Sequence, residues 1–124
     1  MPTLQALQSS GMKLAIITNG PVAWQMRKIR QCGIERFFDS ILVSEAEGIA
    51  KPSPQIFIRA LDRCGVTASE TIFVGDYPEC DIAGALGAGL LPVWKQKPYW
   101  TVAPDIHRID ELHEILPLVS GAID

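Results

Sequence analysis

Short apolar runs alternate along the chain with longer segments in which apolar residues recur at helical spacing. The first run, at 14–17, stops at the polar turn Thr18-Asn19-Gly20, which indicates a strand that ends in a loop. Similar runs follow, and strands are predicted at 14–17, 41–43, 71–74 and 91–94. Because these runs are continuously apolar and do not alternate with polar residues, we expect helices to cover both faces of their sheet.

The ends of helices are marked between these strands. Pro21 suits the first position of a helix and Gly33 the position just past its end, which predicts a helix between them. In the next helix Ser53 is the expected cap, Pro54 begins the helix and Gly65 ends it. Further helices are predicted at 4–8, at 79–88 and from a cap at Asp110 to 119, with a short extended segment at 105–108. The alternation predicts an α/β fold: a doubly wound, Rossmann-like parallel sheet of about four strands flanked by helices.

Composition and charge narrow the class of protein. The 124 residues fit one domain, 1–124, and with 48% apolar and 20% charged residues the chain has enough apolar material to fold. The net charge of −3 and the pI of about 5.3 predict no nucleic-acid partner. The longest apolar stretch, 83–94, is interrupted by glycines and is shorter than the roughly 20 residues of a bilayer-spanning helix, so no membrane partner is expected. The start of the chain lacks the pattern of a secretory signal, and we expect a cytoplasmic protein.

Some residues that often carry chemistry have simpler interpretations here. The glycine-rich segment 84–89 reads GxxGxG within a predicted helix, which differs from a dinucleotide-binding turn and favours close helix packing. His107 and His113 have no metal-ligand spacing and are expected at the surface. The three cysteines lack Cys-x-x-Cys spacing and are expected to be reduced and structural: Cys32, Cys64 and Cys80.

Polar residues follow three of the predicted strands, at the edge where ligands collect in parallel sheets. They comprise a hydroxyl, backbone amides at a helix start, one ammonium and two carboxylates: Thr18, Asn19, Gly20, Lys51, Asp76 and Asp81. Together such groups can hold a phosphate and a magnesium ion. Each also has a structural interpretation, since Thr18 and Asn19 can cap a helix, Lys51 can be solvated, and the aspartates can serve a turn and a helix dipole. From these residues alone both interpretations stay open.

The segments at these strand ends match one family in order and spacing. They are Ile16–Gly20, Ser44–Gly48 leading into Lys51-Pro52, Phe73–Asp76, Asp81–Ala85 and Ala88-Gly89. In this order they resemble the haloacid dehalogenase superfamily of phosphohydrolases, most of all the branch that contains phosphoglycolate phosphatases and nucleoside 5'-monophosphatases. The resemblance runs from the helix before Thr18 to the final predicted helix, with three motifs in register.

The resemblance implies a phosphate site. Thr18 would bind a phosphoryl oxygen, helped by the backbone at Asn19 and Gly20, and Lys51 would neutralise charge between nucleophile and phosphate. The implied reaction is hydrolysis of a small phosphorylated metabolite, a phosphomonoester, through an aspartyl-phosphate. Phosphoryl transfer depends on positioning and on offsetting charge at the equatorial oxygens, and a hydroxyl, an ammonium and a divalent cation can supply both.

The resemblance also implies a metal site and a missing nucleophile. Asp76 would bind Mg²⁺, the implied cofactor, and Asp81 would support the metal site or Lys51. Family members further carry a strand with Asp-x-Asp, whose first aspartate attacks phosphorus and whose second acts as general acid and base, and usually a helical cap that selects the substrate. The present sequence contains no Asp-x-Asp and begins where family members have passed that strand and the cap. We therefore expect a partial, truncated core with negligible phosphatase activity on its own.

The missing strand predicts a structural consequence. In the family it lies between the strand ending at Thr18 and the strand ending at Asp76, and its loss would leave a slot about 9.6 Å wide between two unpaired edges. We expect the chain to recruit a strand from another copy as a homodimer, to pair its own two edges, or, as we favour, to be part of a longer polypeptide. The alternative to a hydrolase is a non-catalytic module that binds phosphate or metal, or that accepts a strand at its open edges.

Overall fold

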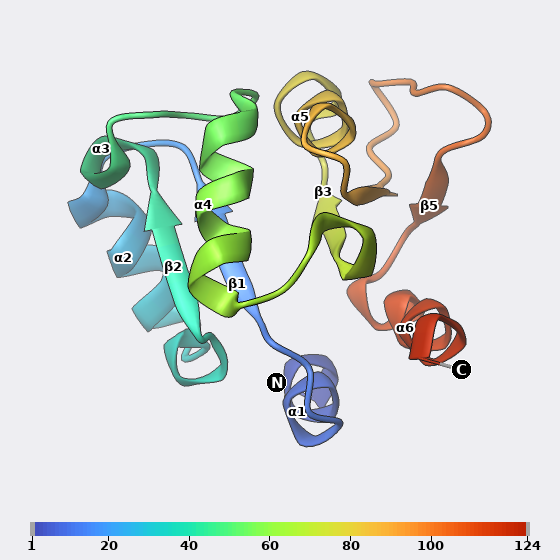
Figure 1. The fold of residues 1–124 in the computed structure, drawn as a ribbon, viewed down its shortest axis with the longest axis horizontal. Helices are drawn as coiled ribbons and strands as arrows, with labels where there is room; N and C mark the ends of the chain where they lie inside the picture. The colour runs from blue at the N-terminus through green and yellow to red at the C-terminus, as the bar shows by residue number, and fades with distance from the viewer. Residues whose placement is uncertain (1, 124) are drawn as a thin grey trace.

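The computed structural model describes residues 2–123, in which helices pack against parallel strands (Figure 1). The α/β class predicted from the sequence is confirmed. Three short 3-10 turns and one π-helical turn, η3 (Pro78–Ile82), join the main elements. In chain order these are α1 (Pro2–Ser9), β1 (Ala15–Thr18), α2 (Val22–Gln31), β2 (Ser40–Val43), α3 (Ser44–Glu47), α4 (Pro54–Cys64), β3 (Ile72–Gly75), α5 (Ala83–Gly87), β4 (Leu91–Lys95), β5 (His107–Ile109) and α6 (Leu116–Ile123).

The strands form two parallel sheets instead of one. β1 pairs with β2, so that Ile17 lies opposite Leu42, and β4 lies between β3 and β5, with Val93 opposite Val74 and His107. The four predicted strands are confirmed, and β5 overlaps the predicted extended segment. Within the described residues, β1 and β3 pair neither with each other nor with a strand between them. Closure of the gap by the chain's own edges, one of the three expected outcomes, is therefore not what the fold adopts.

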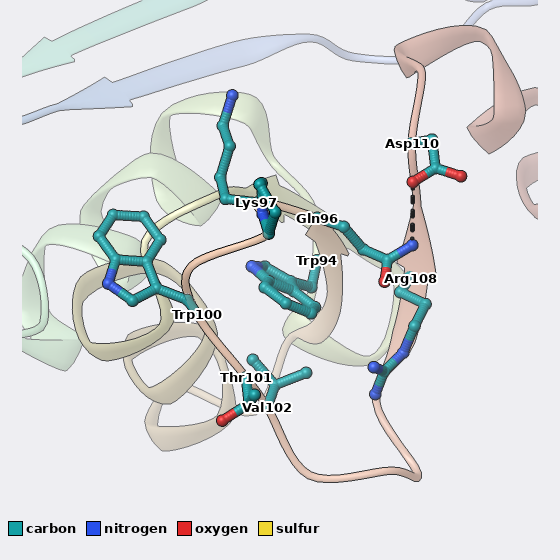
Figure 2. Close-up of a pocket in the computed structure, with 9 residues that line it drawn as sticks. Trp94, Gln96, Lys97, Trp100, Thr101, Val102, Arg108 and Asp110 are labelled. Carbon is teal, nitrogen blue, oxygen red and sulfur yellow. Dashed lines mark hydrogen bonds between the residues drawn. The ribbon is translucent and has the colours of Figure 1, made fainter.

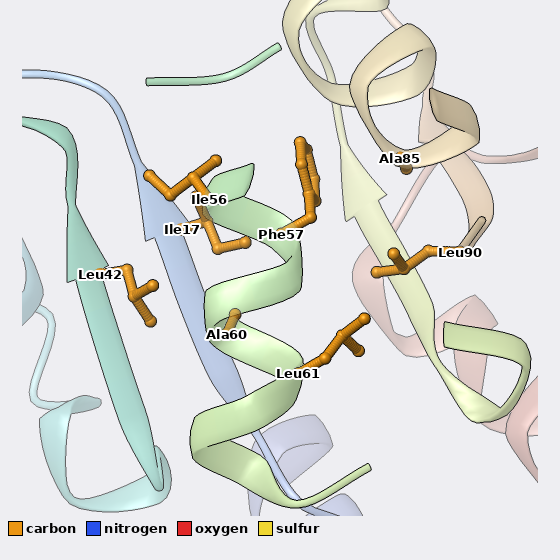
Figure 3. Packing of buried hydrophobic residues seen from close by; sticks show 8 residues of the cluster. All are labelled: Ile17, Leu42, Ile56, Phe57, Ala60, Leu61, Ala85 and Leu90. Atoms are coloured by element: carbon orange, nitrogen blue, oxygen red, sulfur yellow. The ribbon is translucent and has the colours of Figure 1, made fainter. Parts of the chain in front are cut away.

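Helix α4 joins the two sheets through a shared apolar cluster (Figure 3). Phe57 of this helix is fully buried, and its ring meets the ring of Phe73 in β3 edge-on, with centroids 4.9 Å apart. The same helix packs against β1 and β2 on its other side. The buried members of the cluster are Ile17, Leu42, Ile56, Phe57, Ala60, Leu61, Ala85 and Leu90.

A second cluster lies on the opposite face of β3. Ile72 and Val74 pack against it, whereas Phe73 between them packs against the first cluster, as the alternation of side chains along a strand requires. Its buried members come from α1, the 3-10 turn at Glu35–Phe37, β4, β5 and the end of the chain: Leu4, Leu7, Phe37, Val93, Ile109, Ile115 and Val119. Both faces are therefore covered, as the continuously apolar runs predicted.

The predicted helix ends are mostly confirmed. Helix α4 begins at Pro54, and Gly65 follows it with φ of +67°, a conformation that favours glycine. Ser53 occupies the cap position, but its side chain makes no capping hydrogen bond. The segment predicted as one helix at 79–88 is divided into η3 and α5, and the loop expected after β2 contains α3.

The predicted cap at Asp110 is wrong by one residue. Glu111 caps the last 3-10 turn and forms a capping box with Glu114, whose carboxylate accepts the backbone N–H groups of Asp110 and Glu111. The Asp110 carboxylate instead accepts a hydrogen bond of 3.0 Å from Gln96 Nε2, which removes it from the helix end.

The remaining structural interpretations hold. A Cβ on Gly84 would lie 2.7 Å from the Phe57 ring and 3.2 Å from the Cα of Pro52, so the glycine-rich segment serves helix packing. His107 and His113 are exposed, and the three cysteines are free thiols. Burial raises the pKa of the Cys64 thiol. None of the helices within residues 2–123 has the length and apolar content to cross a membrane.

Candidate active site

The residues selected from the sequence meet at one edge of the molecule, where β1 and β3 end. Thr18 is the last residue of β1, and Asp76 directly follows β3. Lys51 connects the two ends, because its backbone is hydrogen-bonded to Asn19 and its ammonium to Asp81. The structure thus brings Asn19, Lys51, Asp76 and Asp81 together, with Thr18 next to Asn19 at the end of β1.

An ion pair between Lys51 and Asp81 forms the centre of this edge. Lys51 Nζ lies 2.6 Å from Asp81 Oδ1, and the two side chains are only 12% and 7% exposed. The ammonium also lies 5.5 Å from the centroid of the Phe73 ring, within reach of a cation–π contact. Burial makes such a pair costly unless further hydrogen bonds satisfy both partners, and the carboxylate has them.

The loop after β3 holds the second oxygen of Asp81. Oδ2 accepts hydrogen bonds of 3.1 Å from the backbone N–H groups of Asp76 and Tyr77. The π-helical turn η3 brings Asp81 back to this loop, where its own N–H donates to the Tyr77 carbonyl at 2.8 Å. A Cβ on Gly75 would collide with the Asp81 side chain, so only glycine allows this approach. Asp81 is thus fixed as the partner of Lys51.

Asn19 positions Lys51 through its side chain. Asn19 Nδ2 donates to the Lys51 carbonyl and Asn19 Oδ1 accepts from the Lys51 N–H, both at 3.0 Å. The side-chain amide of Asn19 thus makes both hydrogen bonds that the backbone of a neighbouring strand would make to Lys51. These bonds link the loop after β1 to the loop that carries Lys51. Cys80 lies at the same place, with its Sγ 3.9 Å from Asn19 Nδ2.

Two residues that the sequence did not single out hold the turn after Thr18. Ser44 Oγ accepts a hydrogen bond of 2.8 Å from the N–H of Gly20, and Gln25 Nε2 donates to the Asn19 carbonyl at 2.8 Å. The amide of Gly20, which was expected to face phosphate, is therefore engaged by Ser44. Ser44 opens one of the motif segments, which is the only signal for it in the sequence.

Trp94 supports the other side of the site. Its indole Nε1 donates a hydrogen bond of 2.9 Å to the carbonyl of Asp76, and the side chain is almost fully buried in β4. No pattern in the sequence predicted this contact, because tryptophan at a strand end is most often a packing residue.

Glu47 anchors the chain between β2 and Lys51. Its carboxylate, in α3, accepts hydrogen bonds from Arg59 and Arg63 of α4 at 2.8–3.0 Å. These bonds hold the pKa of Glu47 below its ordinary value, with Arg63 making the larger contribution. The loop that carries Lys51 is thereby tied to the helix that joins the sheets.

The predicted metal residues differ in their surroundings. Asp76 is exposed, whereas both oxygens of Asp81 are engaged by Lys51 and by backbone amides. Among residues 2–123, no three His, Cys, Asp or Glu side chains gather closely enough to hold a metal ion. Mg²⁺ is often bound by one or two carboxylates together with substrate phosphate and water, so Asp76 fits one position of such a site.

Comparison with known proteins identifies relatives of the chain. The family model described as haloacid dehalogenase-like hydrolase matches residues 1–89. A glyceraldehyde 3-phosphate phosphatase of Methanocaldococcus jannaschii is 40% identical over 123 residues, which cover 96% of this chain and 54% of that protein.

Solved structures are similar over nearly the whole chain. A haloacid dehalogenase-type phosphatase of Thermococcus onnurineus superposes with a TM-score of 0.87 and 31% identity, covering 98% of this chain and 56% of the other. The putative hydrolase YfnB of Bacillus subtilis, solved with bound magnesium, superposes with a TM-score of 0.85 and 30% identity. The match covers 95% of this chain and 53% of YfnB. The chain spans about half the length of these relatives.

Proposed function

The chain belongs to the haloacid dehalogenase-like hydrolase family, and on this premise we propose that it carries the phosphate-binding part of a phosphohydrolase for small phosphomonoesters. The observation that carries the proposal is the buried ammonium of Lys51, held 2.6 Å from Asp81 at the edge where β1 ends in Thr18. A relative named as a glyceraldehyde 3-phosphate phosphatase supports this substrate class.

Each residue has a role in this proposal. Lys51 offsets the charge of the phosphoryl oxygens, and the Thr18 hydroxyl donates to one of them. Asn19 orients Lys51 through its two bonds to the Lys51 backbone, and Asp81 holds the ammonium in place. Asp76 would hold Mg²⁺, which supplies charge stabilisation at the phosphate when bound. The magnesium in the YfnB structure supports this choice of metal for the family.

The proposal leaves the nucleophile to be supplied by a further strand. The 124 residues contain no Asp-x-Asp, and without an attacking carboxylate no aspartyl-phosphate can form. We propose that the chain alone is inactive and that the nucleophile arrives on a strand between β1 and β3. Apolar residues of both clusters flank that position, Ile17 and Phe73 on the α4 side and Leu14 and Val74 on the other. Such a strand would therefore be apolar on both faces.

A second candidate function is a non-catalytic module that accepts a strand, or that binds phosphate or metal without turnover. The observation that favours it is the pair of strands, β1 and β3, that each lack a partner on one side within the described residues. Unpaired strand edges are templates for another chain, a second copy included. Single-domain organisation over 1–124 and a cytoplasmic location stay predictions.

The test measures phosphate release from p-nitrophenyl phosphate with Mg²⁺. The chain alone should release no more than the buffer, and the chain mixed with an apolar peptide that ends in Asp-x-Asp should turn over. The matched control is the same peptide ending in Asn-x-Asn, which fills the slot without supplying a nucleophile. If the chain alone released as much phosphate as the chain with the Asp-x-Asp peptide, the missing-nucleophile proposal would be refuted.

Three further measurements separate the alternatives. If the Asp-x-Asp peptide binds by calorimetry but gives no turnover, the strand-accepting module is favoured over the hydrolase. Size-exclusion chromatography with light scattering tests strand exchange between copies, and a monomer at high concentration would exclude the homodimer. Calorimetry without any heat from phosphate or Mg²⁺ would exclude the ligand-binding version.

A further inference from the structure

Trp94 occupies a position from which its side chain reaches the loop that carries Asp76. In the parallel pairing of β3 with β4, Trp94 lies opposite Gly75, the last residue of β3. Its indole Nε1 donates a hydrogen bond of 2.9 Å to the carbonyl of Asp76, the first residue beyond that strand. Among the aromatic side chains that pack in a core, only tryptophan offers a ring N–H as a donor, and phenylalanine offers none.

The peptide bond between Asp76 and Tyr77 is held at both of its polar groups. Its carbonyl accepts from Trp94, and its N–H donates to Asp81 Oδ2 at 3.1 Å. The same carboxylate oxygen accepts the N–H of Asp76, also at 3.1 Å. Trp94 and Asp81 are 2% and 5% exposed, so both anchors are buried side chains. The backbone on each side of the Asp76 Cα is therefore fixed.

Trp94 is itself held in place by its neighbours. The Arg108 guanidinium carbon lies 5.4 Å from the centroid of the indole, and the guanidinium donates to the carbonyls of Ala103 and Ile106. In Figure 2 the indole nitrogen points away from Arg108. Because β4 is paired on both sides, the backbone that carries the side chain is fixed as well. Trp94 is thus a rigid donor, covered on one side and bonded to Asp76 on the other.

The carboxylate of Asp76 remains available although its backbone is fixed. Asp76 is exposed, and within residues 2–123 its side-chain oxygens take part in no hydrogen bond or ion pair. A carboxylate that is oriented in advance by buried groups binds a cation more tightly, because less order has to be created on binding.

From these observations we propose that Trp94 is a positioning residue for the cation site at Asp76. The inference rests on the proposed function, in which Asp76 holds Mg²⁺. Trp94 fixes the peptide bond that follows Asp76, and with it the direction in which the carboxylate leaves the backbone. Loss of the indole N–H frees that peptide bond on its carbonyl side, so that Asp76 has to be ordered when the cation binds.

Hydrogen exchange of the Tyr77 amide, followed by nuclear magnetic resonance, tests this positioning without any metal. Trp94→Phe should make that amide exchange about ten-fold faster, the equivalent of one lost hydrogen bond. Trp24→Phe is the matched control, because Trp24 lies on α2 and is 64% exposed, and it should change nothing. Unchanged exchange of the Tyr77 amide in Trp94→Phe, with the α4 amides still protected, would overturn the proposal.

A second measurement covers the case in which Trp94→Phe unfolds. In the unaltered chain, a scalar coupling across the hydrogen bond should connect the indole nitrogen of Trp94 with the carbonyl carbon of Asp76. Absence of this coupling would overturn the proposal without the use of a variant.

Titration with Mg²⁺, followed on the amide signals of Asp76 and Tyr77, tests the link to the cation. Trp94→Phe should raise the dissociation constant about ten-fold, and Trp24→Phe should leave it unchanged. Asp76→Asn should abolish the shifts. If the unaltered chain and Asp76→Asn respond alike, the metal site of the proposed function fails, and the role of Trp94 fails with it. If only Asp76→Asn loses the shifts and Trp94→Phe binds Mg²⁺ as tightly as the unaltered chain, the role of Trp94 alone is overturned.

Discussion

Strand β4 and strands β1 and β3 have the same kind of apolar sequence but differ in their surroundings. β4 is paired on both sides, and Pro92, Val93 and Trp94 are buried. β1 and β3 are each paired on one side, and Ile16, like all four residues of β3, is only half-buried. A continuously apolar run indicates that both faces of a strand are covered. The weaker burial of β1 and β3 accompanies their unpaired edges, although β2, which is also paired on one side only, still buries Leu42 completely.

The comparison explains why the two sheets stay together without a strand between them. They are joined across the faces by α4 and at the edge by Lys51, which bonds to Asn19 after β1 and to Asp81 beside β3. The following predictions test these joints in order of expected effect.

Removal of Phe57 should have the largest effect. Phe57→Ala deletes a fully buried ring that contacts β3, and we expect a loss of about 3–5 kcal/mol in the free energy of unfolding. Ile58→Ala on the same helix, where the side chain is 47% exposed, should cost about 0.5 kcal/mol or less. Urea unfolding measures both, and similar losses would show that α4 does not join the sheets.

Loss of the Lys51 ammonium should come next. Lys51→Met removes the cation and leaves the buried Asp81 carboxylate with only its two amide donors. We therefore expect a loss of about 3 kcal/mol in the free energy of unfolding. The matched control is Arg30→Met, which breaks the exposed pair with Glu35 and should cost about 1 kcal/mol at most. Combining Lys51→Met with Asp81→Asn should cost less than the sum of the single losses, and simple additivity would argue against the pair.

A methyl group at Gly84 should separate α4 from α5. Gly84→Ala places a Cβ against the Phe57 ring and the Pro52 backbone, and overpacking of this kind costs about 1–3 kcal/mol. Gly87→Ala in the same helix adds a Cβ that meets nothing within 4 Å and should be neutral or slightly stabilising. Thermal unfolding of the two variants measures the difference, and equal melting temperatures would contradict this packing.

The Glu47 anchor should have a smaller, pH-dependent effect. Its pKa is lower in the folded chain, so its contribution is complete above the unfolded pKa and disappears as the pH falls through the folded pKa. Glu47→Gln should cost about 1 kcal/mol near pH 7 and almost nothing well below the ordinary glutamate pKa. Urea unfolding at several pH values measures the difference in the free energy of unfolding between the unaltered chain and Glu47→Gln. If this difference were constant from acidic to neutral pH, the arginine contacts would not stabilise α3 against α4.

Local signals in the sequence predicted where helices and strands lie better than which strands and side chains pair with one another. Pro54 and Gly65 define the ends of α4 because their backbone preferences act locally, and four strands followed from apolar runs. The cap at Asp110 failed because that carboxylate is engaged by Gln96, a contact across 14 residues. The apolar runs did not predict the division of the sheet. The unpaired edges of β1 and β3 were expected only from the resemblance, in which a further strand lies between them.

The candidate site shows the same limit. Its motif residues were predicted to lie close together, and hydrogen bonds join Asn19, Lys51 and Asp81, because parallel strands bring their carboxyl ends to one edge. The supporting contacts were not predicted: Ser44 on Gly20, and Trp94 on Asp76. Each joins residues that are distant in sequence, through atoms whose orientation only the fold determines.

Amide hydrogen exchange, resolved by residue, tests the central claim that β1 and β3 each keep an unpaired edge. The amides of Val93 and Trp94 in β4 should be the slowest to exchange, and the amides of β1 and β3 that point away from β2 and β4 should exchange orders of magnitude faster. Addition of the Asp-x-Asp peptide should slow that second group alone. Equal protection of all three strands in the chain by itself would contradict the account.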